Sequence, residues 1–272
     1  GTISGITSWN SDGYVLGNNA GINANGVTAV SWNWKAGGSA SSNSNGSITS
    51  SVSASTDAGF SIVSWTGNGS TATIGHGLGS APKVVIIKSR DGSASWFLGH
   101  QSLGWTKYMT LENSNAINDD VIWNDTDPTS NVFSVGSYSS TNGSGVKFIG
   151  YCFAEKKGYS KIGGSYVGNG NNDGAFIYTG FRPAWIMLKN TSNAQNWYIY
   201  DNKRTPTNFA NYHFYADLHN AEAGGSTLGI DILSNGWKIK TSNDGWNGSG
   251  ENYIYMAFAE SPFVNSNGIP NN

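Results

Sequence analysis

Residues 81–88 read Ala-Pro-Lys-Val-Val-Ile-Ile-Lys, and residues 182–189 read Arg-Pro-Ala-Trp-Ile-Met-Leu-Lys. Both stretches carry proline at the second position and continue as a short, mostly apolar run, as a buried β-strand does. Related segments surround both stretches at matching spacing, which indicates that this strand belongs to a unit that occurs twice. The sequence therefore predicts a fold built from two equivalent units.

The repeat extends over roughly 100 residues in each copy, and such self-similarity usually reflects a recurring structural unit. The copies are assigned to residues 58–157 and 158–264. The further matching pairs are residues 65–69 and 166–170, 96–98 and 197–199, 108–111 and 215–218, 133–135 and 237–239, 142–145 and 247–250, and 153–155 and 258–260.

A third, partial copy is predicted in residues 1–35. Residues 14–17 match 133–136, and residues 26–34 match 145–153 at the same spacing. Because only the closing hairpin of a repeat is represented, we expect the chain to begin inside a longer protein. The alternative is that this hairpin completes the first sheet on its own.

Two further segments differ in composition from the repeats. Residues 36–57 consist largely of Gly, Ser, Ala, Asn and Thr, a composition typical of a flexible linker or an exposed loop. A strand with small side chains packed on another subunit is the alternative. Residues 265–272 are assigned to a C-terminal tail.

The local patterns favour an all-β fold of tandem, jelly-roll-like β-sandwich repeats. Residues 132–135 and 237–239 alternate in polarity as half-buried strands do. Asn-Gly pairs at 142–143 and 247–248 predict hairpin turns, because both turn positions need a positive φ. Counting such runs gives about seven or eight strands per copy, as in a sandwich.

Composition narrows the function classes. Only 12% of the 272 residues are charged and 13% are aromatic, which is typical of a folded chain and unlike a disordered one. The formal net charge of −2 argues against a nucleic-acid partner. No apolar run is long enough to cross a bilayer, so no membrane insertion is expected. The single Cys152 excludes an internal disulfide and a cysteine-based zinc site.

Several motifs together resemble a repeat domain that is widespread in virion proteins of marine bacteriophages. The motifs are residues 60–69, 75–82, 123–126, 178–183, 201–204, 233–237 and 257–263. The resemblance covers nearly the whole chain. It implies a structural protein of the virion, typically tail-fibre-like or lectin-like, and it supplies no catalytic residues.

The function expected from this resemblance is a non-catalytic virion module, in a tail fibre or its tip, that attaches to the host surface. The expected partners are further copies of the chain, in a homotrimer, other virion proteins, and a bacterial surface glycan or receptor. A purely structural capsid decoration or spacer protein is the first alternative. A glycan-binding lectin or a depolymerase is the second.

Catalytic and metal-binding patterns are weak. No G-x-S-x-G elbow occurs, and no histidine recurs at one position in both copies. The sequence has one dense acidic cluster, which is a weak candidate for metal binding. Glycoside cleavage needs a pair of carboxylates, and only this cluster could supply it, but its pattern fits a turn better. It comprises Asp119, Asp120, Asp125 and Asp127. Residues 169–174 imitate half of an EF-hand loop, but Gly180 occupies the position of the bidentate glutamate. We therefore expect no cofactor, no catalytic residues and no enzymatic activity.

Aromatic residues divide into two groups. Those that recur, such as Trp96 and Trp197, are expected in the cores. Those without a counterpart in the other copy are candidates for contact with a ligand or receptor, or equally with another subunit. They are Trp105, Trp123, Tyr138, Tyr212 and Trp246.

Overall fold

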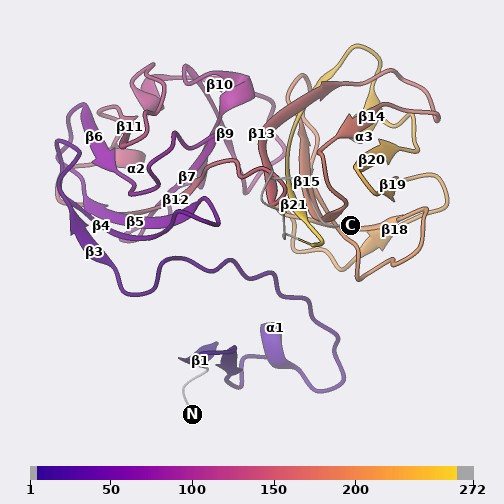
Figure 1. Cartoon of the computed structure of the whole chain (residues 1–272), viewed down its shortest axis with the longest axis horizontal. Coiled ribbons are helices and arrows are strands. Elements are labelled where there is room, and N and C mark those ends of the chain that lie inside the picture. The colour runs from indigo at the N-terminus through magenta and orange to yellow at the C-terminus, as the bar shows by residue number, and fades with distance from the viewer. Residues whose placement is uncertain (1–4, 262–272) are drawn as a thin grey trace. The chain divides into compact units, whose positions relative to one another are not determined.

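The computed structural model describes residues 5–261. The chain divides into two compact units, residues 1–34 and 35–272, and consists mainly of antiparallel strands (Figure 1). None of the helices among the described residues exceeds four residues. The all-β prediction is thus confirmed. The tail predicted at 265–272 lies outside the described residues.

The first unit contains an antiparallel hairpin, β1 (Ile6–Trp9) and β2 (Tyr14–Leu16), followed by α1 (Ala20–Asn23). The Asn23 side-chain amide donates a hydrogen bond to the carbonyl oxygen of Gly17 at 2.8 Å. Residues 27–34 form no regular strand. Each of the two later copies has a similar closing segment, with paired strands, a short helix and an asparagine amide that donates to the carbonyl oxygen six residues earlier.

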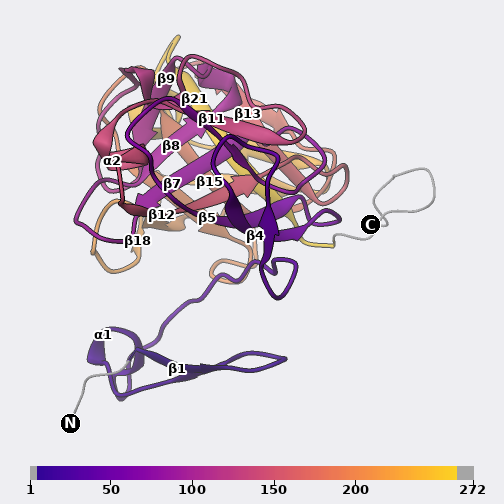
Figure 2. The ribbon, with the colours of Figure 1, turned by 90° about the vertical axis from the view of Figure 1, so that its left-hand side faces the viewer.

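The first copy, repeat 1 (residues 58–157), lies mainly in an eight-stranded sheet with the order β10-β9-β8-β7-β12-β5-β4-β3 (Figure 2). A two-stranded sheet, β6 (Ala72–Gly75) with β11 (Val132–Val135), completes it. The strands of the large sheet are β3 (Ser41–Asn43), β4 (Ser50–Ser55), β5 (Phe60–Thr66), β7 (Val84–Ser89), β8 (Phe97–His100), β9 (Lys107–Thr110), β10 (Asn118–Asp119) and β12 (Lys147–Phe153). Two short 3-10 helices, η1 (Gln101–Leu103) and η2 (Val121–Trp123), lie between them in sequence.

The second copy, repeat 2 (residues 158–264), has a six-stranded sheet with the order β13-β21-β15-β16-β17-β18 and a three-stranded sheet with the order β14-β20-β19. The strands of the larger sheet are β13 (Ser160–Val167), β15 (Pro183–Asn190), β16 (Trp197–Asp201), β17 (Tyr212–Tyr215), β18 (Ala223–Gly224) and β21 (Asn252–Ala259). Those of the smaller sheet are β14 (Phe176–Tyr178), β19 (Ile230–Leu233) and β20 (Gly236–Ile239).

The two copies share one topology. The last strand of each, β12 or β21, lies inside the large sheet and pairs with the first and third strands of its own copy. Each core fills the space between the large and the small sheet. The ring centroids of Trp65 and Phe133 are 5.7 Å apart in repeat 1, and those of the matching pair Tyr166 and Trp237 are 5.5 Å apart in repeat 2.

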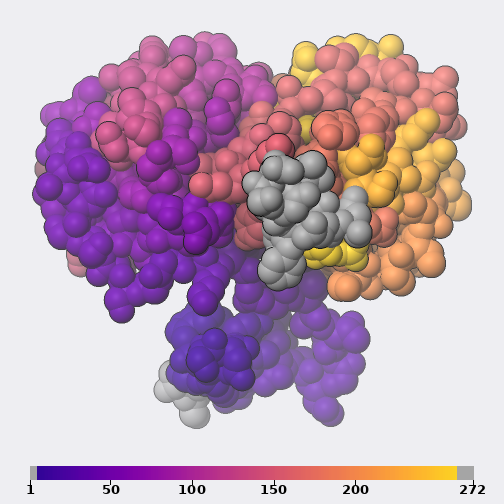
Figure 3. All heavy atoms as spheres, in the orientation of Figure 1, coloured from indigo at the N-terminus to yellow at the C-terminus, as the bar shows by residue number. Residues whose placement is uncertain are grey.

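The two repeats pack against each other within the second unit. Trp197 donates its indole N–H to the Thr110 carbonyl oxygen at 3.0 Å. Leu98 of repeat 1 and Met187 of repeat 2, both buried, line one small apolar cavity at this contact. Figure 3 shows the atoms of the two repeats as adjoining lobes. The repeats therefore form one body.

The Gly/Ser-rich stretch 36–57 is not the linker or exposed loop that its composition predicted. It forms β3 and β4, which extend the large sheet of repeat 1. Val52 is buried in the core, and the hydroxyl of Ser50 donates to the Gly75 carbonyl oxygen at 2.8 Å. Backbone pairing with β5 holds this segment in place although its side chains are small.

The Asn-Gly pairs do not form the predicted hairpin turns. Asn142 and Asn247 are the last residues of two short helices, α2 (Ser139–Asn142) and α3 (Asp244–Asn247). The glycines after them have φ of −55° and −57° instead of positive values. Both asparagine side chains are fully buried. Each asparagine was therefore correctly identified as a recurring feature, but its structural role was misassigned.

Candidate functional site

Three of the five aromatic residues predicted to contact a ligand are buried. Trp105, Trp123 and Trp246 are 5%, 0% and 2% exposed. The prediction that they face a ligand is therefore wrong. Tyr138 and Tyr212 are 39% and 45% exposed and remain available for contacts.

A compensating exchange in the cores explains two of these errors. Repeat 1 has Gly99 at the position where the matched segments put Tyr200 in repeat 2. A Cβ atom on Gly99 would lie 2.5 Å from the Trp105 ring and 2.7 Å from the Trp123 ring. The two tryptophans thus occupy the space above this glycine, whereas repeat 2 buries the Tyr200 side chain.

The four aspartates of the acidic cluster do not converge. Asp119 forms an ion pair with Lys107, and Asp120 accepts a hydrogen bond from the Val121 backbone N–H at 2.7 Å. Asp125 lies in a left-handed turn with φ of 46°. Within residues 5–261, no group of three or more Asp, Glu, His or Cys side chains is arranged to hold a metal ion.

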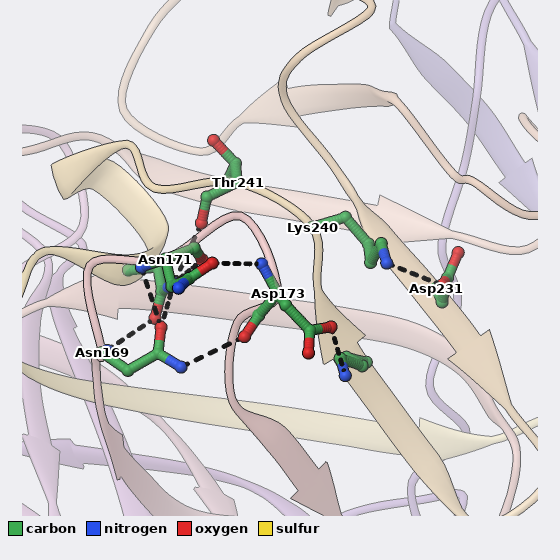
Figure 4. Close-up of polar contacts among 8 residues, drawn as sticks. Asn169, Asn171, Asp173, Asp231, Lys240 and Thr241 are labelled. Carbon is green, nitrogen blue, oxygen red and sulfur yellow. Dashed lines mark hydrogen bonds and ion pairs between the residues drawn. The ribbon is translucent and has the colours of Figure 1, made fainter.

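The Asn/Gly-rich turn after β13 uses its oxygens internally. Asn169 Oδ1 accepts from the Asn171 N–H at 3.0 Å, and Asn171 Oδ1 accepts from the Asp173 N–H at 2.9 Å. Figure 4 shows these three side chains along one turn beside Thr241. Asp173 also pairs with Lys238 at 2.6 Å, which lowers the pKa of its carboxyl group. The Gly/Asn turn predicted here fits this geometry.

Three of the four histidines are buried and not accessible to a substrate. His76, His100 and His213 are at most 1% exposed. Burial lowers the pKa of each, to about 4 for His100 and His213. These side chains are therefore neutral near pH 7 and belong to the interior.

An open hollow of about 380 Å³ lies on the large sheet of repeat 1. We call it the repeat-1 hollow. Strands β3, β4 and β5 supply mainly hydroxyl groups, while the residue after β7 and the first residue of β12 supply cations. Its lining consists of Ser42, Thr49, Ser50, Ser51, Ser64, Trp65, Thr66, Arg90 and Lys147.

A hollow of about 360 Å³, the repeat-2 hollow, lies on the corresponding strands of repeat 2. Repeat 2 supplies Ser165, Thr191, Ser192, Asn252, Tyr253 and Ile254, and repeat 1 supplies Ser102, Leu103 and Ile117. The equivalence follows from strand register. Ser64 pairs with Ile149 in repeat 1, and Ser165 pairs with Ile254 in repeat 2.

A corresponding backbone hydrogen bond lies beside each hollow. The Arg90 N–H donates to the Lys147 carbonyl oxygen at 2.8 Å, and the Thr191 N–H donates to the Asn252 carbonyl oxygen at 2.8 Å. Arg90 therefore corresponds to Thr191, and Lys147 corresponds to Asn252. The same backbone pairing thus occurs in both repeats, but the two side chains at this pair are cations in repeat 1 and neutral in repeat 2.

Aromatic side chains continue the same sheet face beyond the repeat-1 hollow. Lys147 and Tyr151 are four residues apart on β12, so they lie on one face of the strand. Tyr151 stacks on Trp96 with ring centroids 6.2 Å apart and an interplanar angle of 25°. Both rings are partly exposed, so Trp96, unlike Trp197, does not lie in the core as its recurrence predicted. Such a surface can stack on the apolar face of a sugar ring.

The sequence reasoning missed the hollows because their residues come from distant segments. The lining of the repeat-1 hollow runs from Ser42 to Lys147, and none of it forms a local motif. One signal was available, namely the replacement of Arg90 and Lys147 by Thr191 and Asn252 between otherwise matching segments.

Comparisons with known proteins give one match. A family described as a domain of unknown function, DUF7483, matches residues 1–262, which include the first unit and both repeats. No curated protein and no solved structure matches the chain. The described part of the chain has no helix that is both long and apolar enough to span a membrane.

Proposed function

We propose that this chain, which belongs to the DUF7483 family of domains of unknown function, is a non-catalytic virion module of a bacteriophage that binds a glycan on the host surface. The observation that carries the proposal is the recurrence of an open hollow on corresponding strands of both repeats. A surface feature that recurs with the fold while its side chains change is suited to recognition.

The chemistry of the repeat-1 hollow supports sugar binding. Serine and threonine hydroxyls both donate and accept hydrogen bonds, as sugar hydroxyls do. Ser51 and Thr66 are exposed at the hollow, and Ser64 is half-buried there. Among the described residues that line it, none carries a carboxylate or an imidazole. Hydrolysis of a glycoside requires a pair of carboxylates, so this lining favours holding a glycan over cleaving it.

The resemblance to repeat domains of phage virion proteins supports the virion assignment, in a tail fibre or its tip. We further propose that the chain acts as a homotrimer, because fibres usually assemble symmetrically. Phe176 and Tyr178 are 47% and 64% exposed on the same strand, β14. They are available for such a contact. Sedimentation of the purified chain as a monomer at micromolar concentration would contradict this assembly.

Adhesion is tested with the full chain, fluorescently labelled, on a panel of marine bacteria and their extracted polysaccharides. Saturable binding to at least one strain, competed by its polysaccharide, is the expected result. Absence of binding by the properly assembled oligomer across the panel would refute adhesion. Release of reducing ends from a bound polysaccharide would identify a depolymerase instead.

Virion location needs a separate measurement. Electron cryomicroscopy of the phage that encodes this chain should place the two adjoining lobes in density on a tail appendage. Density on the capsid face would select a decoration protein, and density between other tail proteins would select a spacer.

A further inference from the structure

We infer that the repeat-1 hollow selects a sugar residue that carries an anionic substituent, and that the repeat-2 hollow does not. This inference rests on the proposed glycan-binding function and adds the chemical class of the ligand. The repeat-1 hollow is the ligand site, and Arg90 and Lys147 are the residues that set its selectivity.

The two cations are free to meet an anion. Arg90 and Lys147 are exposed, both line the hollow, and neither forms an ion pair with another described residue. Asp91 is the neighbouring carboxylate, and its Oδ2 accepts a hydrogen bond from the Lys147 backbone N–H at 2.8 Å. The Asp91 carboxylate keeps its negative charge, so Arg90, Lys147 and Asp91 together carry a net charge of +1. The side-chain N–H groups of the two cations, beside hydroxyl groups, remain for the ligand.

The residue types match an acidic sugar. An arginine guanidinium presents parallel N–H groups that pair with two oxygens of a carboxylate or a phosphate. The lysine ammonium adds a point charge from β12, where the Lys147 carbonyl oxygen accepts the Arg90 N–H. Ser51, Ser64 and Thr66 offer partners for the ring hydroxyls. A short glycan with an acidic group can use these contacts, which extend across β4, β5 and β12 to the residue after β7.

The repeat-2 hollow is an internal comparison with the same backbone pairing. It has Thr191 and Asn252 in place of the cations, and no charged residue belongs to its described lining. The Thr191 hydroxyl donates to the Asn252 carbonyl oxygen at 3.0 Å, so this hydroxyl is already engaged. Since the volumes are similar, at about 380 and 360 Å³, while the charge differs, selectivity for an anion is expected in repeat 1 alone.

The test replaces the repeat-1 residues with their repeat-2 counterparts in the full chain, as Arg90→Thr with Lys147→Asn. Both positions are exposed, so the fold should tolerate the change. The control variant, Lys157→Thr with Lys203→Asn, removes the same charge from exposed positions outside the hollow. Titration calorimetry measures binding of three probes: a galacturonic acid trisaccharide, glucose 6-phosphate and neutral maltotriose.

We expect the wild-type chain and the control variant to bind at least one acidic probe more tightly than maltotriose. The Arg90→Thr/Lys147→Asn variant should bind that probe at least about tenfold more weakly, because charge-assisted hydrogen bonds are lost. Tighter binding of the trisaccharide identifies a carboxylate ligand, and tighter binding of the phosphorylated sugar identifies a phosphate ligand. Unchanged affinity in the Arg90→Thr/Lys147→Asn variant, or no preference of the wild type over maltotriose, overturns the inference.

Adhesion to whole cells, measured with the same variants, separates the two proposals. If the Arg90→Thr/Lys147→Asn variant adheres as well as the wild type, the inference about this hollow is wrong while glycan-mediated attachment stands. If the wild type binds neither cells nor any glycan, the proposed function itself fails.

Discussion

Replacement of Asn247 by alanine should destabilise the chain more than most substitutions of a small polar residue. The Asn247 side chain is fully buried at the end of α3. Its amide nitrogen lies 2.8 Å from Asn169 Oδ1, 2.8 Å from the Asn171 carbonyl oxygen and 3.0 Å from the Thr241 carbonyl oxygen. Its Oδ1 accepts from the Asn169 N–H at 2.9 Å. One side chain thus ties α3 to the turn after β13 and to the segment that follows β20.

The magnitude follows from these contacts. The two amide hydrogens and the one acceptor make three full hydrogen bonds, each with a net contribution of about 1 kcal/mol. The Asn169 N–H, which is partly buried at this bond, is left without an acceptor and adds about 1 kcal/mol more. We expect the free energy of unfolding to fall by about 4 kcal/mol. For a body of this size, that corresponds to a melting temperature lower by roughly 8–16 °C.

Asn142 supplies an internal comparison. Its amide nitrogen lies 2.6 Å from the Ser70 carbonyl oxygen, but its distances to Asn68 Oδ1 and the Gly136 carbonyl oxygen are 3.1 and 3.3 Å. The hydrogen bond that its Oδ1 accepts is 3.4 Å long. Because longer bonds are weaker, Asn142→Ala should cost less, about 2–3 kcal/mol.

Urea denaturation monitored by tryptophan fluorescence measures both losses. Asn247→Asp distinguishes hydrogen bonding from lost volume, because the carboxylate has nearly the same shape but at pH 7 donates no hydrogen bond to the three oxygens. It should therefore destabilise at least as much as alanine. A change below about 1 kcal/mol for both Asn247 variants, within the range of ordinary surface substitutions, would refute the role assigned to this side chain.

Four further results are expected. His100 donates to the Tyr255 carbonyl oxygen and accepts from the Ser102 N–H, and burial lowers its pKa to about 4. The contribution of neutral His100 to stability is therefore full above pH 6.5, and up to about 3 kcal/mol of it is lost as the pH falls toward 4. Urea titrations in which His100→Gln leaves this acid loss unchanged would contradict this. Cys152 is buried, and its pKa is raised to about 12, so iodoacetamide should label it only as fast as the chain unfolds; rapid labelling of the native protein would refute this burial. Gly99→Ala places a methyl group against two tryptophan rings and should cost about 1–3 kcal/mol in calorimetry, whereas a neutral effect would show that the rings move aside. Thr191→Arg with Asn252→Lys should raise the number of acidic trisaccharides bound per chain from one to two, and an unchanged number would argue against equivalent hollows.

The β-class and the repeat were predictable because they depend on local alternation and on spacing along the chain. The strand at residues 182–189 illustrates this, since β15 covers Pro183–Asn190. The Gly/Ser-rich stretch was not predictable in the same way. Its strands are stabilised by backbone pairing with β5, and composition carries no information about the pairing partner.

The asparagine error has a physical reason that a comparison of the three copies reveals. Asn142 and Asn247 precede glycine, whereas Asn23, which makes the corresponding bond in the first unit, precedes alanine. The feature common to all three copies is the amide side chain and not the Asn-Gly pair. A hairpin rule reads only neighbouring residues, and the contacts of Asn247 reach back 78 residues to Asn169.

The candidate site depended on contacts that no single segment encodes. Aromatic residues without a counterpart in the other copy were predicted to mark the site, but Trp105 and Trp123 fill the space that Gly99 leaves in the core. Hydroxyl groups from β3, β4 and β5 meet Arg90 and Lys147 only after the sheet has formed. Sequence comparison between copies marks where they differ, and the structure is needed to show that the two differences at Arg90 and Lys147 lie in one hollow.

An experimental structure of the full chain crystallised with the galacturonic acid trisaccharide would show whether the repeat-1 hollow binds an acidic sugar. Sugar density is expected over β4, β5 and β12, with a carboxylate within hydrogen-bonding distance of Arg90 or Lys147. Sugar bound only in the repeat-2 hollow, or only on a surface outside both hollows, would contradict this expectation.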